Sequence, residues 1–369
     1  MRMPDSPPRL PAFTFEPNAS PVSATDRASR IADPGFGKVF TDHMAIIRYR
    51  EGIGWHDAKI TARGPISLDP AAAVLHYAQE IFEGLKAYAL DDGTMALFRP
   101  DANAARFNAS ADRMAMPRLP EATFIESCRQ LVHIDRAWFP PIAGGSIYLR
   151  PFMFASEVFL GVKPSAEYLF IVIATATGNY FKSGAPAVQL MVAQNDTRAA
   201  PGGTGAVKCG GNYAASLRAQ QSAIAQGFDQ VVFLDAAERR YVEELGGMNL
   251  FFVFDDGSMV TPPLDGTILP GITRDSLITL AREQGLVVRE ERYSIEQWRA
   301  DAASGRMTEC FACGTAAVVT PVASVTGADF TATVGSGGPG QITEQMKQSL
   351  VAIQRGGKAD HYGWVHPIG

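Results

Sequence analysis

Short runs rich in apolar and β-branched residues follow one another along the first half of the chain and predict β-strands, two of them buried, at residues 146–154 and 167–177. Two stretches instead repeat apolar residues every three to four positions and predict helices, the first capped by Asp101. An Asp92-Gly93 turn between two strand-like runs predicts a hairpin. The predicted strands are residues 42–50, 55–63, 84–90, 94–99, 146–154 and 167–177, and the predicted helices are residues 101–113 and 123–138. Together they predict an α+β unit of about 150 residues.

The second half of the chain is richer in strand-like runs. A helix is predicted at residues 213–226, with Tyr213, Leu217 and Ile224 on one face, and others within 269–285 and 342–355. The strand-like runs are residues 188–195, 230–237, 241–246, 249–254 and 286–294, with a strand–turn–strand over 307–327. Many strands with few helices predict a larger, barrel-like domain.

Changes in composition along the chain predict the domain boundaries. The N-terminal segment has scattered prolines and no continuous apolar run, so we expect residues 1–30 to form a poorly ordered leader and not a secretory signal. A cluster of Gly, Ser and Pro separates two strongly apolar runs and predicts a linker at 178–187. The remaining residues then form a small α/β domain at 31–177 and a large domain at 188–369.

The overall composition excludes several classes of protein. Of the 369 residues, 46% are hydrophobic and 19% are charged, which excludes a disordered chain. The formal net charge of −5 supplies no general field for nucleic acid, so any bound anion needs a local site. No apolar run approaches the ~20 residues of a membrane span. Four cysteines in a chain of this length are no disulfide framework, and they favour a reducing compartment, the cytoplasm.

Cys310 and Cys313 form a C-x-x-C motif, which is typical of zinc or redox sites. A structural zinc site needs a second pair of ligands, and the sequence has no matching C-x-x-C or H-x₃-H. The surrounding segment is predicted to be a strand entering a turn, whereas redox motifs of this kind begin a helix. We therefore expect two small buried residues and no metal.

The glycine-rich loop around Lys208 is the first candidate for chemistry. It is no P-loop, because Val207 precedes the lysine and Cys209 follows it, and it does not match G-x-G-x-x-G. Glycines on both sides let the backbone approach a flat or phosphorylated ligand closely. The loop by itself leaves two interpretations open. Lys208 is either an exposed, solvated charge or a desolvated amine that forms a Schiff base.

Three other segments favour the second interpretation. Glu244 ends a strand before two glycines, and a buried carboxylate requires a cation, which the protonated ring nitrogen of pyridoxal phosphate can supply. The L-P-G-I-T-R segment places the N–H groups of Ile272 and Thr273 at a helix start, where a phosphate can bind, although an ordinary helix N-terminus fits as well. The small-residue turn 314–317 offers a hydroxyl and N–H donors to an oxyanion.

Eight motifs, in order along the chain, resemble those of branched-chain-amino-acid aminotransferases, which are class IV pyridoxal-phosphate enzymes of fold type IV. The resemblance runs from about Phe36 to the C-terminus. The motifs are FGKVFTDHM, HYAQEIFEGLKAY, LFRPDANAARF, IYLRP, KCGGNYAAS, EELGGMN, LPGITRDS and CGTAAVVTPV. The resemblance implies a two-domain α+β fold, with a small α/β N-terminal domain and a larger barrel-like domain that binds pyridoxal 5'-phosphate. It also implies a homodimer.

The resemblance implies roles for the residues around the cofactor. Lys208 matches the Schiff-base lysine, which also moves the proton between the substrate Cα and the cofactor. Tyr213 matches the phenol that hydrogen-bonds the cofactor's O3′, and Glu244 matches the carboxylate at the ring nitrogen. The groups that match the family's phosphate-binding site are the Arg106 side chain, the amides of Ile272 and Thr273, and the hydroxyl of Thr315.

The resemblance also implies a substrate site. The turn at Thr315 and Ala316 matches the segment that receives the substrate α-carboxylate, and Arg150 matches the arginine for the acidic co-substrate. The residues that match the family's aromatic side-chain pocket are Phe36, Tyr77, Phe82 and Tyr148. Leu160 and Val162 match a loop that the partner subunit contributes to the site. The implied reaction transfers the amino group of leucine, isoleucine or valine to 2-oxoglutarate in a ping-pong cycle.

Other functions stay open at this point. A D-amino-acid aminotransferase or an aminodeoxychorismate lyase has the same fold, but the Y-L-R and F-E-G-L-K-A-Y segments argue against both. A phosphate-binding module without catalytic activity would not need Lys208.

Overall fold

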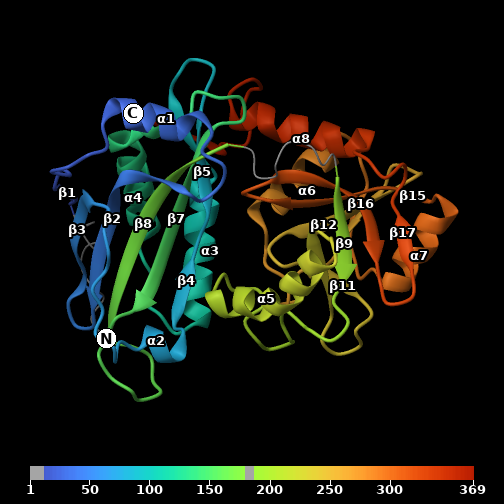
Figure 1. The fold of residues 1–369 in the computed structure, drawn as a ribbon, viewed down its shortest axis with the longest axis horizontal. Coiled ribbons are helices and arrows are strands. Elements are labelled where there is room, and N and C mark those ends of the chain that lie inside the picture. Colours follow the sequence, from blue (N-terminus) through green and yellow to red (C-terminus); the bar gives the residue numbers. More distant parts are fainter. Residues whose placement is uncertain (1–11, 179–186) are drawn as a thin grey trace, which may run out of the picture. The chain divides into compact units, whose positions relative to one another are not determined.

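The computed structural model describes residues 12–178 and 187–369, and the chain divides into two compact units (Figure 1). The first unit holds most of the first half of the chain and also the last four residues, His366–Gly369. The second holds the rest together with the short segment Leu90–Gly93. The division after Gly178 coincides with the start of the expected linker, whose residues 179–186 lie outside the described part of the chain.

The first unit is built on one mostly antiparallel sheet. Among the described residues its strand order is β1-β3-β2-β8-β7-β5-β6-β18, and β4 pairs with β7. The strands are β1 (Thr14–Phe15), β2 (Val39–Arg50), β3 (Gly54–Ala62), β4 (Glu80–Phe82), β5 (Leu85–Ala89), β6 (Met95–Phe98), β7 (Ser146–Ala155), β8 (Glu167–Thr177) and β18 (Val365–Ile368). The predicted strand pair β2–β3 and the predicted hairpin β5–β6 are both confirmed as antiparallel.

Helices cover this sheet and close its core. They are α1 (Ala24–Ala32), α2 (Val74–Tyr77), α3 (Pro100–Arg113) and α4 (Glu121–Ile134), with a short 3₁₀ turn at Arg136–Trp138. Phe107 of α3, Phe124 of α4 and Phe170 of β8 are fully buried, and their ring centroids lie 5.4 to 6.0 Å apart. These aromatic contacts hold the two predicted helices against the sheet.

The structure differs from the expected leader at residues 12–30, while residues 1–11 lie outside the described chain. This segment contains β1, which pairs with β3, and helix α1. Asp42 of β2 anchors the chain just before the helix. Its carboxylate accepts hydrogen bonds from the Val22 N–H at 3.0 Å and from the Trp138 indole N–H at 2.9 Å. The sequence did carry a signal for this helix, because its N-cap Ser23 accepts the Asp26 N–H at 3.1 Å and Ile31 is buried on one face.

The second unit is built on a mixed sheet that curves into the expected barrel-like form (Figure 1). Over the part of the chain that is described, the strand order is β11-β10-β9-β16-β15-β12-β13-β14, and β17 pairs with β16. The strands are β9 (Val188–Val192), β10 (Gln230–Leu234), β11 (Val242–Leu245), β12 (Asn249–Phe254), β13 (Met259–Thr261), β14 (Val288–Glu290), β15 (Met307–Gly314), β16 (Val318–Thr326) and β17 (Thr331–Thr333). The helices are α5 (Gly210–Ala225), α6 (Ile272–Glu283), α7 (Ile295–Ser304) and α8 (Gln341–Gln354).

Helix α5 lies where predicted, but a different face of it packs on the sheet. Leu217 and Ile224 are 65% and 62% exposed, whereas Ala219 and Ala223 are buried against Val231 of β10 and its neighbours. Small side chains let the helix lie close to the strand, and the larger ones are left outside. Among the described helices of both units, none has the length and apolar character that crossing a bilayer requires.

Candidate active site

Lys208 and Tyr213 form the centre of the candidate site in the second unit. Lys208 lies just before α5 and Tyr213 in its first turn, and the Lys208 Nζ lies 2.9 Å from the Tyr213 hydroxyl. Lys208 is half-buried, so its amine is neither fully solvated nor closed off. Two side chains that the resemblance assigned to the cofactor therefore lie within hydrogen-bond distance of each other.

Asn212 holds the loop that carries Lys208, a role that the sequence analysis missed. Its side-chain amide donates to the carbonyls of Thr204 and Val207 at 2.6 and 2.7 Å, and its Oδ1 accepts the Thr204 hydroxyl at 2.8 Å. Gly205 is needed in the same loop, since a Cβ there would lie 2.4 Å from the Thr267 carbonyl oxygen. The glycines thus serve close backbone packing as well as any ligand.

Glu244 is buried near the end of β11 and is held by one ion pair and two hydrogen bonds. Its Oε1 lies 2.5 Å from Nη2 of Arg198 and accepts the Leu269 N–H at 3.0 Å, while Oε2 is 3.3 Å from the Asn249 side-chain amide. Burial raises the pKa of Glu244, whereas Arg198, the Leu269 N–H and Lys208 act in the opposite direction. Sequence reasoning assigned a cofactor nitrogen as the cation that this carboxylate requires. The structure shows that a cation of the protein itself, Arg198, already forms an ion pair with Glu244.

The turn between β15 and β16 lies beside this centre. A Cβ on Gly314 would be 3.6 Å from the Gly247 carbonyl oxygen, and a Cβ on Gly247 would be 3.5 Å from the Tyr213 ring. The turn that carries Thr315 and Ala316 is therefore on the same side of the unit as Tyr213. Val318, which closes the turn, has a φ of +64°. A β-branched residue in this conformation is strained, and such strain is concentrated at ligand-binding turns.

Helix α6 begins next to Glu244. Its N-cap is Gly271, which has no side chain to accept hydrogen bonds from the N–H groups of the first turn, where Ile272 and Thr273 lie. A Cβ on Gly271 would lie 2.0 Å from Oδ1 of Asn249. The Asn249 amide also donates to the Leu269 carbonyl at 3.1 Å, so one asparagine joins the helix start to the buried carboxylate. Such a helix start suits a phosphate group.

Four predicted substrate residues cluster in the first unit. The rings of Phe36 and Tyr148 meet edge to face with centroids 5.1 Å apart. The Arg150 guanidinium lies 4.7 Å from the centre of the Phe82 ring and donates to the Tyr148 hydroxyl at 3.0 Å. Gly84 makes room for them, because a Cβ there would lie 2.0 Å from that hydroxyl oxygen. The cluster combines an apolar wall with one cation.

Tyr77, Leu160 and Val162 lie together at the surface of the first unit. The Tyr77 hydroxyl donates to the Leu160 carbonyl, and the side chains of Leu160 and Val162 are 62% and 89% exposed. Val158 and Leu75 beside them are exposed as well. These residues together form an exposed apolar group on this unit.

Arg106 of α3 is held in place by Glu83, a second residue that the sequence analysis missed. The two form a bidentate pair at 2.7 and 2.8 Å, and the Glu83 side chain is completely buried. Glu83 lies inside the F-E-G-L-K-A-Y segment, so a buried glutamate among apolar residues was the signal that pointed to it. The role of Arg106 toward a phosphate remains a prediction.

Cys310 and Cys313 lie in β15, as predicted, and both are buried. Three positions apart in a strand, they point to opposite faces, and Cys310 joins the hydrophobic core that contains Phe252 and Trp298. Burial raises the pKa of both thiols, which keeps them protonated and unreactive. Within residues 12–178 and 187–369, no group of three or more His, Cys, Asp or Glu side chains is arranged to hold a metal ion.

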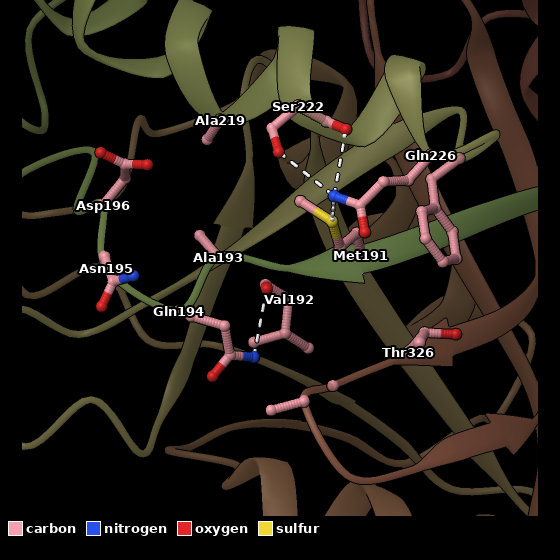
Figure 2. A pocket seen from close by; sticks show the side chains of 13 residues that line it. Met191, Val192, Ala193, Gln194, Asn195, Asp196, Ala219, Ser222, Gln226 and Thr326 are labelled. Carbon is pink, nitrogen blue, oxygen red and sulfur yellow. Dashed lines mark hydrogen bonds between the residues drawn. The ribbon is translucent and has the colours of Figure 1, made fainter.

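A pocket of about 340 Å³ lies elsewhere in the second unit, between α5 and the segment that follows β9 (Figure 2). Its wall mixes polar and apolar side chains, and the Gln226 amide donates there to the Ser222 carbonyl and hydroxyl at 3.2 Å. None of the predicted site residues lines it. It is therefore separate from the Lys208 centre.

Comparisons with known proteins agree with this geometry. The sequence model of the amino-transferase class IV family matches residues 80–325. The branched-chain-amino-acid aminotransferase of Mycolicibacterium smegmatis is 54% identical over 357 residues, which cover 96% of this chain and 97% of that protein. The chain therefore belongs to the class IV aminotransferases, and within them to the branched-chain-amino-acid aminotransferase family.

Solved structures show the same fold. The branched-chain amino acid aminotransferase from Escherichia coli is 31% identical, with a TM-score of 0.72 over 89% of this chain and 99% of that one. The enzyme of the same name from Thermobaculum terrenum, solved in its PLP form, is 25% identical, with a TM-score of 0.71 over 88% and 98% of the two chains. The expected α+β fold of fold type IV is thereby confirmed, and the protein is a pyridoxal-phosphate-dependent transferase.

Proposed function

We propose that the protein binds pyridoxal 5'-phosphate and transfers amino groups reversibly between L-leucine, L-isoleucine or L-valine and 2-oxoglutarate. The products are the branched-chain 2-oxo acids and L-glutamate. The observation that carries the proposal is the convergence of Lys208, Tyr213 and Glu244 within the second unit. The relatives named above support the choice of substrates.

The donors of the second unit fit this cofactor. An aldehyde needs a primary amine, which Lys208 supplies, and a phenolic oxygen needs a donor such as the Tyr213 hydroxyl. A ring nitrogen that carries a proton needs an acceptor, and Oε2 of Glu244 has only one contact with the described residues, at 3.3 Å. The start of α6 suits the phosphate, and we assign Ile272, Thr273, Thr315 and Arg106 to that group.

Each residue then has a separate task. When bound, the cofactor supplies the electron sink for the bond broken at the substrate Cα. Lys208 anchors the cofactor and afterwards moves the proton to and from that carbon. Tyr213 orients the Lys208 amine through its hydroxyl, and Glu244 holds the proton of the ring nitrogen. The turn at Thr315 and Ala316 binds the substrate carboxylate with its N–H groups.

We assign the substrate side chain to the cluster around Arg150. Phe36, Phe82 and Tyr148 provide an apolar wall for a branched aliphatic chain. Nε of Arg150 is buried and has no hydrogen-bond partner among the described residues, which leaves a donor for the distal carboxylate of glutamate or 2-oxoglutarate. A pocket that accepts both substrates in turn suits a ping-pong cycle.

We further propose a homodimer and a cytoplasmic location. The exposed group formed by Tyr77, Leu160 and Val162 is the surface that we expect to contact the partner subunit and complete its site. All four cysteines are free and buried, in keeping with a reducing compartment.

The test is a substrate panel with the purified protein. Cofactor content is measured by absorbance, and glutamate formation from 2-oxoglutarate is measured with L-leucine, L-isoleucine, L-valine, D-alanine and aminodeoxychorismate. We expect about one cofactor per chain and turnover with the three branched-chain L-amino acids. Turnover restricted to a D-amino acid, or pyruvate release from aminodeoxychorismate, supports one of the other class IV activities. A protein that binds no cofactor is not an aminotransferase.

A further inference from the structure

We propose that Arg198 is a positioning residue of the cofactor site, which keeps Glu244 ionised and leaves one defined oxygen of that carboxylate for the ring nitrogen. The proposal rests on the proposed function, because it assigns Glu244 to a bound pyridoxal phosphate. Arg198 belongs to the T-R-A-A-P segment before the glycine-rich loop, and no motif of the sequence analysis included it.

The contact between the two charges is buried on both sides. The side chains of Arg198 and Glu244 are 4% and 3% exposed, and Nη2 lies 2.5 Å from Oε1. The other titratable groups that act on Glu244 are Lys208, Glu243 and Cys313. Of these three groups, only Lys208 carries a positive charge, and its amine is the group that would bond to the cofactor. Arg198 is therefore the cation that remains for Glu244 when Lys208 is engaged.

The two oxygens of Glu244 are used unequally. Among the described residues, Oε1 accepts the Leu269 N–H and pairs with the charge of Arg198, whereas Oε2 has a single contact of 3.3 Å with the Asn249 amide. Because the positive charge of Arg198 lies at Oε1, rotation of the carboxylate would separate this ion pair and break the hydrogen bond from the Leu269 N–H. Oε2 is thus the oxygen with spare capacity for an N–H donor of the ring.

Arg198 also ties together three segments that meet at the site. The same Nη2 atom donates to the Gly205 carbonyl at 2.9 Å and to the Thr267 carbonyl at 2.6 Å. Gly205 lies in the loop that leads to Lys208, and Thr267 lies in the segment that leads to α6. A lysine at this position keeps a positive charge near Glu244, so Arg198→Lys separates the effect of the charge from that of the two contacts with backbone carbonyls.

The experiment follows the proton of the ring nitrogen directly. Wild-type protein and the variants Arg198→Met and Arg198→Lys are stripped of cofactor and reloaded with pyridoxal phosphate that carries ¹⁵N in the ring, and the ¹⁵N chemical shift is recorded from pH 6 to 9. We expect a protonated nitrogen in the wild type at pH 7.5. In Arg198→Met the proton should leave the nitrogen at a pH lower by about one unit or more. Arg198→Lys should restore most of the wild-type shift.

A matched control separates this role from a general loss of stability. Tyr293→Phe removes the partly buried hydrogen bond that the Tyr293 hydroxyl donates to Asp301, and neither residue belongs to the Glu244 cluster. It should lower the unfolding temperature while leaving the ¹⁵N titration unchanged. The dissociation constant of the cofactor, measured on the same samples, should rise about tenfold in Arg198→Met and stay within about twofold in Tyr293→Phe.

A double-mutant cycle on the cofactor-free protein tests the pair without any ligand. Arg198→Met and Glu244→Gln should each lower the unfolding temperature, because each leaves one buried partner unmatched. The double variant should lose less than the sum of the two, since no charge then remains uncompensated. Strict additivity overturns the pairing even if Arg198→Met cannot be reloaded with cofactor.

The outcomes distinguish this proposal from the proposed function. A wild-type protein that binds no pyridoxal phosphate overturns both. A wild-type protein that binds it, together with an Arg198→Met variant whose nitrogen titrates as in the wild type, overturns the role of Arg198 alone.

Discussion

Arg106 and Glu83 form a bidentate ion pair, with Nε 2.7 Å from Oε1 and Nη2 2.8 Å from Oε2. Arg129 and Glu126 in the same unit form a pair of nearly identical geometry, with both distances 2.7 Å. The pairs differ in burial: the first has side chains 9% and 0% exposed, the second 39% and 33%. The two pairs therefore allow the effect of burial to be measured at constant geometry.

Glu83→Gln should destabilise the cofactor-free protein by about 3 kcal/mol or more, because it leaves a buried guanidinium without its partner charge. Glu126→Gln is the matched control and should cost about 1 kcal/mol or less, since water screens the exposed pair. Urea unfolding of both variants measures the difference. Equal losses would show that Glu83 does not hold Arg106 in place.

Cys310→Ala should leave the transamination rate within a few-fold of the wild type. The thiol lies in the core beside Phe252 and Trp298, its pKa is raised by burial, and it points away from the face of Cys313. The measurements are the rate with L-leucine, before and after mild oxidation, and the metal content by elemental analysis. One equivalent of zinc, or an oxidative inactivation that Cys310→Ala abolishes, would contradict this prediction.

Features of the fold that depend on neighbours in sequence could be predicted from the sequence. One helix that was not predicted also has a recognisable sequence signal. Lys208 and Tyr213 are five residues apart across a helix start, so local geometry sufficed to place them together. Helix α7 was missed although Ser294 and Gln297 form a capping box, with both reciprocal hydrogen bonds present. The helix was overlooked because the second half of the chain was predicted to consist mostly of strands.

The ion pairs around the site were beyond the reach of periodicity. Glu83 contacts Arg106, and Glu244 contacts Arg198, only because strands and loops distant in sequence meet in the folded units. Hydrophobic patterns predict which face of an element is buried, but they do not say which charges meet there. The motifs therefore identified Glu244 as important, while its protein partner required coordinates.

Dilution should abolish activity if the exposed group formed by Tyr77, Leu160 and Val162 completes the site of a partner subunit. Val162→Asp places a charge on a side chain that is 89% exposed, so it should leave the fold intact and weaken dimerisation. Ile53→Asp is the control, because Ile53 is 62% exposed in the turn between β2 and β3. Sedimentation and rate are followed over protein concentration. A stable monomer with full activity would contradict the prediction.

Arg150→Met should weaken the glutamate half-reaction more than the leucine half-reaction. The guanidinium can pair with the distal carboxylate of glutamate, whereas leucine offers it no charge. One lost charge-assisted hydrogen bond is worth ~1.5–3 kcal/mol, about ten- to a hundredfold in rate. Tyr148→Phe removes only the hydroxyl that Arg150 contacts and should have a smaller effect. The two half-reactions are measured in single turnovers, and equal losses in both would make Arg150 a support for the aromatic wall.

Replacing Lys208 and replacing Glu244 should impair the enzyme in different ways. Lys208 bonds to the cofactor, whereas Glu244 holds the proton of the cofactor's ring nitrogen. Lys208→Ala should still fold and retain cofactor through the helix start at Ile272 and Thr273, but lose the visible absorbance of a lysine-bound cofactor and all turnover. Glu244→Gln should keep that absorbance and lose orders of magnitude in rate, since the ring nitrogen is no longer held protonated. Spectra and single-turnover rates on both variants decide the matter. Lysine-type absorbance in Lys208→Ala, or normal turnover in Glu244→Gln, would show that these two roles are wrongly assigned.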